Sequence, residues 1–79
     1  MEQESTTLDR GTVGSRYEIR SIELPLNVAK RLEALGMTEG TMVEVLNSKN
    51  RGTLIVRVRG TRFALGRDIT RQIRVEDSL

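Results

Sequence analysis

The chain has 79 residues, of which 37% are hydrophobic and 30% charged, with a formal net charge of +2, as is typical of one small soluble domain. Because its longest apolar run is Leu54-Ile55-Val56 and a membrane-spanning helix needs about 20 such residues, we expect no membrane span. From the acidic start Met1-Glu2-Gln3-Glu4 we also expect no secretory signal. The chain contains no Cys and no His, so we expect a cytoplasmic protein that is not an enzyme and has no catalytic, cofactor or metal site.

The N-terminal residues carry little structural signal. Residues 1–7 are polar without an apolar period, which predicts a flexible N-terminus in front of one domain over residues 8–79. Leu8 is the first core candidate. Gly11 and Gly14 then predict a loop in which both glycines have positive φ.

The first predicted strand follows this loop. Tyr17-Glu18-Ile19-Arg20 alternates apolar and charged side chains, which is the period of a half-buried strand. The alternation breaks between Ile19 and Ile22, and this break predicts a β-bulge or the end of the strand.

One clear helix is predicted over Asn27–Leu35. Asn27 follows Pro25 closely and is a good N-cap residue, since its side chain can accept a bond from a free backbone N–H. Gly36 suits the left-handed position after the last turn. The spacing of the apolar residues predicts a core-facing stripe made of Val28, Leu32 and Leu35, with Met37 folding back on the last turn.

The remaining half of the chain reads as short strands separated by turns. Residues 48–52 predict a hairpin loop with positive φ at Asn50 and Gly52. Around this loop the sequence predicts strands at 41–46, 54–59, 62–65 and 73–75, and one helical turn within 67–72. Five short strands and one short helix indicate a mostly-β fold, a small barrel.

Positive charge is concentrated in the second half. Residues 45–75 contain eight basic side chains and one acid, Asp68, for a net charge of +7. We hypothesise that one surface of this half steers the chain toward an acidic partner; the alternative is a solvated barrel surface. The arginines expected on that surface are Arg57, Arg59, Arg62, Arg67 and Arg71.

The order and spacing of several motifs resemble those of the FeoA family of ferrous-iron transport accessory proteins. Residues 31–45 resemble its helix ending in Leu-Gly-Leu/Met, its turn and its Val-rich strand, with Glu39 where the family usually has Pro. Residues 8–14 resemble its opening loop, residues 56–65 its V-x-V-x-G-x-x-x-A-L hairpin, and residues 73–75 its closing I-x-V.

The resemblance implies an SH3-like β-barrel that acts by binding. The implied partner is FeoB, a membrane ferrous-iron transporter whose cytosolic part is a GTP-binding domain, so the chain could sit peripherally at the inner face of the membrane. A homo-oligomer is left open. The same barrel occurs as a regulatory domain of iron-dependent repressors, which is an alternative reading, because a fold does not fix a function.

A second alternative is a basic barrel that binds nucleic acid. We expect Tyr17 and Phe63, the aromatic residues of the chain, to point inward, which disfavours base stacking. The exposed part of the helix and of the 36–40 turn is the better docking candidate for a protein partner. Together with the arginines named above, the candidate partner-binding residues are Lys30, Arg31, Met37 and Glu39.

Overall fold

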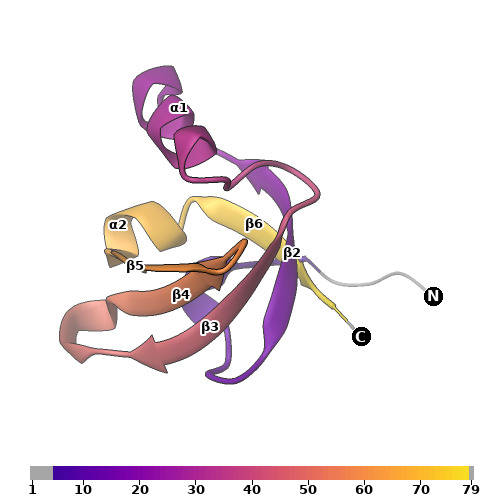
Figure 1. The fold of residues 1–79 in the computed structure, drawn as a ribbon. Helices are drawn as coiled ribbons and strands as arrows, with labels where there is room; N and C mark the ends of the chain where they lie inside the picture. Colours follow the sequence, from indigo (N-terminus) through magenta and orange to yellow (C-terminus); the bar gives the residue numbers. More distant parts are fainter. Residues whose placement is uncertain (1–4, 79) are drawn as a thin grey trace.

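The computed structural model describes residues 5–78 and shows a mostly-β domain built on one curled antiparallel sheet (Figure 1). The order of its strands is β1-β6-β2-β3-β4-β5. The strands are β1 (Thr6–Thr7), β2 (Arg16–Ile22), β3 (Met42–Ser48), β4 (Leu54–Val58), β5 (Thr61–Leu65) and β6 (Ile73–Asp77). The helices are η1 (Leu8–Arg10), α1 (Leu26–Ala34), η2 (Asn50–Gly52) and α2 (Arg67–Thr70).

The described part of the chain contains six strands rather than the five that the sequence predicted. The additional strand is β1, in which Thr6 lies opposite Val75 of β6. Its two residues are too few to show an alternating pattern, and only pairing with β6 makes them a strand. Residues 1–4 of the predicted flexible N-terminus lie outside the described residues.

The core lies inside the curled sheet and is closed by the segment that follows α1. Strand residues at alternate positions supply most of it, as the period-two pattern predicted. The buried hydrophobic residues are Leu8, Tyr17, Ile19, Leu32, Met37, Val43, Val45, Leu54, Val56, Val58, Leu65, Ile73 and Val75.

The bulge predicted in β2 is confirmed. The register between β2 and β6 shifts between Ile19 and Ser21, which leaves Arg20 as the extra residue. The helical turn predicted within 67–72 is also confirmed as α2, with Ile69 packed against the core.

The start of α1 differs from the prediction. The N-cap is Pro25, whose carbonyl accepts bonds from the N–H groups of Val28 and Ala29 at 3.0 and 2.9 Å, so Asn27 lies inside the helix and makes no capping bond. Leu35, expected in the core stripe, is 47% exposed because the helix ends at Ala34 and the chain turns there. The predicted end is confirmed by Gly36, whose φ is +96°.

Two of the predicted positive-φ positions are wrong. In the hairpin loop Arg51 and Gly52, rather than Asn50, have positive φ. Gly11 has a φ of −66°, whereas Gly14 has the expected positive value. Gly11 fits a crowded position, since an added Cβ would lie 3.0 Å from the Leu8 carbonyl oxygen and 3.1 Å from the Tyr17 ring and would push these atoms aside.

Candidate docking site

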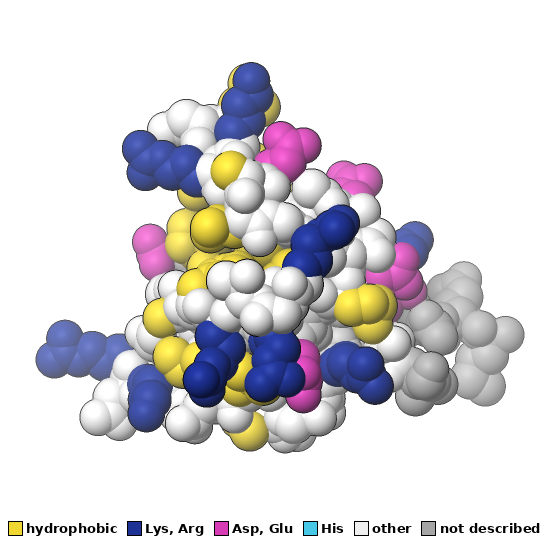
Figure 2. All heavy atoms as spheres, in the orientation of Figure 1, with side chains coloured by type: hydrophobic (Ala, Val, Ile, Leu, Met, Phe, Trp, Pro, Cys, Tyr) yellow, Lys and Arg dark blue, Asp and Glu magenta, His cyan; other side chains and the backbone are white. Residues whose placement is uncertain are grey.

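A groove of about 460 Å³ separates α1 from the barrel. The helix has two different faces. Leu32 is buried in the core, whereas Val28, also predicted for the core stripe, is only half-buried. The residues at i, i+3, i+4 and i+7 from Leu26 line the groove. Figure 2 shows hydrophobic side chains exposed at the boundary between this helix and the barrel. The lining residues are Ile22, Leu26, Ala29, Lys30, Glu33, Met37, Thr38 and Glu39.

The groove combines an apolar floor with a charged rim. Leu26 is 71% exposed, the highest exposure among the large hydrophobic side chains that stand out at the described surface. Lys30, Glu33 and Glu39 are also exposed and lie around it. Burying most of a leucine side chain contributes about 1.5–2 kcal/mol, so a partner that covers Leu26 gains affinity, and the rim can select its charges.

The structure brings three of the predicted helix and turn candidates into this groove. Lys30 and Glu39 lie on the rim. Met37 borders the groove but has no exposed surface, because its N–H binds the Leu32 carbonyl at 2.9 Å and the side chain folds into the core. It therefore supports the groove from below and, contrary to the prediction, offers a partner no contact surface. Arg31 is exposed on α1 but does not line the groove.

Ile22 and Leu26 are groove residues that the sequence reasoning missed. The predicted helix began at Asn27, so Leu26 lay outside it and was not considered as part of an exposed helix face. The signal that could have found it is Pro25, because a helix that starts directly after this proline, as it does in the structure, contains Leu26. Ile22 gave no such signal, because its place beside α1 depends on the packing of the helix.

The predicted arginines do not gather at one point. Arg57 lies directly opposite Arg62 on β4 and β5, and its guanidinium pairs with Glu44 at 3.3 Å. Arg59 occupies the turn between these strands and its side chain crosses Gly36, where an added Cβ would lie 2.9 Å from Arg59 Cδ.

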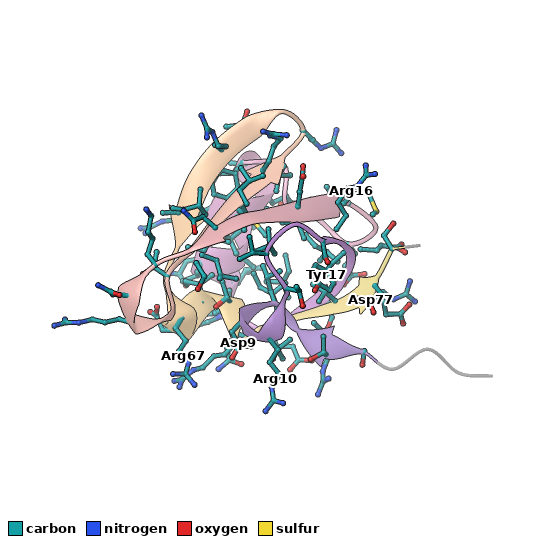
Figure 3. The ribbon with its side chains drawn as sticks, turned by 90° about the horizontal axis from the view of Figure 1, so that it is seen from below. Asp9, Arg10, Arg16, Tyr17, Arg67 and Asp77 are labelled. Carbon is teal, nitrogen blue, oxygen red and sulfur yellow. The ribbon has the colours of Figure 1, made fainter. Side chains whose placement is uncertain are left out.

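The other two arginines lie beyond the far end of the hairpin. Arg67 packs over Gly52 and shares a hollow of about 370 Å³ with Asp9 and Arg10 (Figure 3). Arg71 is exposed directly after α2. The basic side chains therefore spread along the β4–β5 hairpin and past it, and Arg57 and Arg62 are the pair that the fold places side by side.

Both aromatic side chains are used by the core. Tyr17 is 4% exposed and its hydroxyl accepts a hydrogen bond from the Thr12 N–H at 2.6 Å. Phe63 is half-buried and packs against the core. Neither presents the exposed ring that stacks on a base.

The described residues offer neither a metal cluster nor a membrane span. Within residues 5–78, no three His, Cys, Asp or Glu side chains come together where they could hold a metal ion. Over the same residues, no helix has the length and apolar character that crossing a membrane requires.

Comparison with known proteins identifies the family to which this chain is similar. The sequence model of the FeoA domain matches residues 6–77. The chain is 28% identical over 65 residues to the "Putative Fe(2+) transport protein A" of Methanocaldococcus jannaschii, covering 82% of this chain and 78% of that protein.

Solved structures of FeoA proteins have the same fold as this chain. The crystal structure of an iron uptake regulatory protein, FeoA, superposes with a TM-score of 0.86 at 27% identity, covering 95% of this chain and all of that one. FeoA of Stenotrophomonas maltophilia, solved with zinc and described as a procaryotic SH3 domain protein, gives 0.75 at 29%, covering 89% and 88%.

A manganese-dependent transcriptional repressor shares the fold alone. Its TM-score is 0.86 at 15% identity, and the match covers 99% of this chain but 44% of that protein. The SH3-like barrel expected from the sequence is thus confirmed by proteins of two different activities, so the barrel by itself does not choose between them.

Proposed function

Because the chain belongs to the FeoA family of ferrous-iron transport accessory proteins, we propose that it binds the cytosolic GTP-binding part of a FeoB-type iron transporter. It acts from the cytoplasmic side of the membrane, where that part of the transporter lies. Its action is protein–protein recognition, and the iron is cargo of the transporter.

The observation that carries this proposal is the exposed apolar groove beside α1. Leu26 is 71% exposed and lines this groove together with the fully buried Met37. A partner that covers a large apolar side chain at the edge of a preformed hollow removes that surface from water, which favours binding. We therefore place the contact with the transporter at α1 and the 36–40 turn.

The charges on the rim define what the transporter must present. Lys30, Glu33 and Glu39 are exposed and line the groove together with Leu26. A complementary segment supplies an apolar side chain that covers Leu26 and a basic side chain that reaches Glu39. Opposite charges at a rim act chiefly on association and on the choice of partner.

The proposal is tested with the full chain and the purified cytosolic region of FeoB. Leu26→Glu removes the apolar contact and leaves the core untouched, since this side chain faces solvent. We expect it to weaken binding about tenfold or more in isothermal titration calorimetry. Val13→Glu is the matched control, because Val13 is also an exposed hydrophobic residue, at 50%, and lies in the 11–14 loop outside the groove.

Three outcomes decide the proposal. Weaker binding of Leu26→Glu together with normal binding of Val13→Glu supports it. Equal binding of both variants and the unchanged chain places the contact elsewhere and overturns the groove as the docking site. Failure of the unchanged chain to bind the FeoB region at all overturns the proposed partner.

A further inference from the structure

β5 is the last strand of the sheet, at the edge opposite to β1, and Figure 1 shows it beside β4. It pairs along its whole length with β4 and, within residues 5–78, with no other strand. Its five residues include no Pro and no bulge, two devices that often blunt an edge. An open strand edge of this kind is a template for another extended chain.

The turn before β5 determines which of its backbone groups are free. Arg59 and Gly60 both have positive φ, +53° and +83°, as in the type I′ turns that connect tightly paired strands. Such a turn closes on a hydrogen-bonded pair, here Val58 and Thr61, and bonded and non-bonded pairs alternate from there.

The non-bonded positions of β5 are therefore Arg62 and Ala64, which lie opposite Arg57 and Ile55. Their N–H and C=O groups point away from β4 toward the open edge. Among residues 5–78, no other element donates or accepts a hydrogen bond at these groups. Both residues are exposed, so an added strand can reach them.

A row of charges crosses the sheet and ends at the same edge. Arg16, Glu44, Arg57 and Arg62 lie opposite one another on β2, β3, β4 and β5. Glu44 pairs with Arg57 at 3.3 Å. Arg62 lies opposite the like charge of Arg57, and no carboxylate among residues 5–78 comes within 4.0 Å of it. An acid on the next strand would complete the row, since opposite charges across neighbouring strands stabilise their pairing.

We infer that β5 accepts an extended segment of a partner protein that has an acidic side chain opposite Arg62. Ladder bonds to Arg62 and Ala64 supply the affinity, and the acid determines the register. On the inner side the segment presents an apolar residue beside Phe63, which is half-buried against the core. A second copy fits poorly, because pairing two β5 edges would bring two sets of Arg57 and Arg62 together.

The test uses the full, isotope-labelled chain and a synthetic peptide, acetyl-Thr-Val-Glu-Val-Glu-Val-Thr-amide, which alternates acidic and apolar faces. In the free protein, hydrogen exchange followed by NMR should be fast at the Arg62 and Ala64 amides and slower at Phe63. Addition of the peptide should slow exchange at Arg62 and Ala64 about tenfold or more, with shifts confined to β5 and its neighbours.

Two changed peptides separate strand addition from charge attraction. Backbone N-methylation of the central residues keeps the acids but blocks the ladder bonds, and should weaken binding about tenfold. Lysine in place of both glutamates should abolish binding. The Arg62→Glu variant should bind the lysine peptide more tightly than the glutamate peptide. Arg31→Glu, the same charge change on α1, should leave the affinity for the glutamate peptide unchanged.

Several results would overturn the inference. Slow exchange at Arg62 and Ala64 in the free monomer would mean that the edge is already covered. Equal affinity of the N-methylated peptide would show charge attraction without strand pairing. Shifts centred on α1 would show that the peptide binds there and not at β5. Shifts of β5 that depend on protein concentration in the absence of peptide would show that the edge pairs with a second copy of the chain. None of these results depends on FeoB.

Discussion

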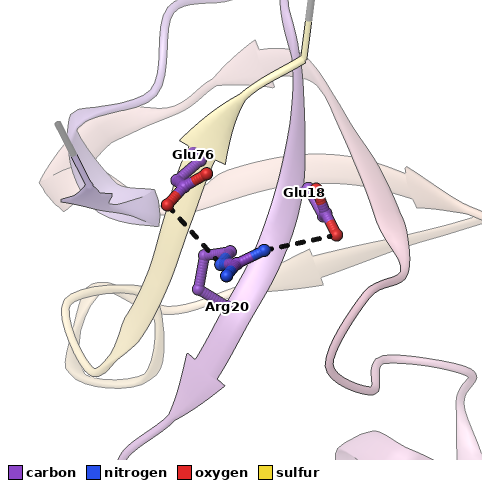
Figure 4. Close-up of polar contacts among 3 residues, drawn as sticks. All are labelled: Glu18, Arg20 and Glu76. Atoms are coloured by element: carbon purple, nitrogen blue, oxygen red, sulfur yellow. Dashed lines mark ion pairs between the residues drawn. The ribbon is translucent and has the colours of Figure 1, made fainter. Parts of the chain in front are cut away.

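Glu18 and Glu76 lie directly opposite each other across β2 and β6, and the guanidinium of Arg20 pairs with both (Figure 4). The distances are 3.6 Å from Arg20 Nη1 to Glu18 Oε2 and 3.5 Å from Arg20 Nε to Glu76 Oε2. Like charges at opposed positions destabilise a strand pair. The β-bulge places Arg20 so that one cation serves both carboxylates, which gives the local irregularity of β2 a physical role.

Arg20→Ala should therefore destabilise the chain by about 0.5–1 kcal/mol in urea denaturation. The side chains of Arg20 and Glu18 are 50% and 40% exposed, so solvent screens the interaction and keeps the effect small. The loss should shrink at high salt. In a Glu76→Gln background the same change should cost less, because the opposed charges are gone; an equal cost in both backgrounds would contradict the coupling.

Two leucines of the α1 segment should respond very differently to truncation. Leu32 is 5% exposed and Leu35 is 47% exposed. Leu32→Ala should cost about 2–5 kcal/mol, which is enough to unfold much of a domain of this size. Leu35→Ala should cost under about 1 kcal/mol. Circular dichroism during urea denaturation measures both, and similar losses would mean that α1 packs with a different face.

Alanine substitutions at Gly36 and Gly40 should distinguish the cost of backbone strain from the cost of a steric clash. Gly36 and Gly40 have φ values of +96° and +88°, so alanine at either should cost about 1 kcal/mol or more. At Gly36 the new Cβ would also lie 2.9 Å from Arg59 Cδ, whereas nothing lies within 4 Å at Gly40. Gly36→Ala should be the more destabilising change in thermal or urea denaturation.

The excess cost at Gly36 has its own control. Arg59→Ala removes the overlapping side chain, so in that background Gly36→Ala should cost about as much as Gly40→Ala. An excess that persists without Arg59 would place the conflict in the backbone of the turn. This pair of measurements also tests the contact that ties the β4–β5 turn to the end of α1.

Electrostatic steering should depend on where the arginines lie. Arg57→Gln combined with Arg62→Gln removes the neighbouring pair, and we expect association with the FeoB cytosolic region to slow roughly two- to fivefold at low ionic strength. Arg10→Gln combined with Arg51→Gln lowers the net charge equally at two other exposed positions. Stopped-flow measurement of both should show the larger effect for the first; equal slowing would indicate that only net charge matters.

Local signals in the sequence were sufficient for most elements of the fold. Alternating side chains predicted the strands and the break at Arg20, and Gly36 predicted the end of the helix, because these features depend on residues a few positions apart. The start of the helix was misplaced since two local signals competed there, and Pro25 rather than Asn27 forms the cap.

The candidate surfaces could not be derived in this way. The groove exists because Ile22, the exposed face of α1 around Leu26, and Met37 come from three segments that meet only when the helix packs on the barrel. The open edge at β5 depends on the order of the strands, in which β6 pairs with β1 and β2 and leaves β5 at the end. The sequence determined which residues alternate and where the chain turns; long-range packing alone decided which side chains meet and which backbone groups stay free.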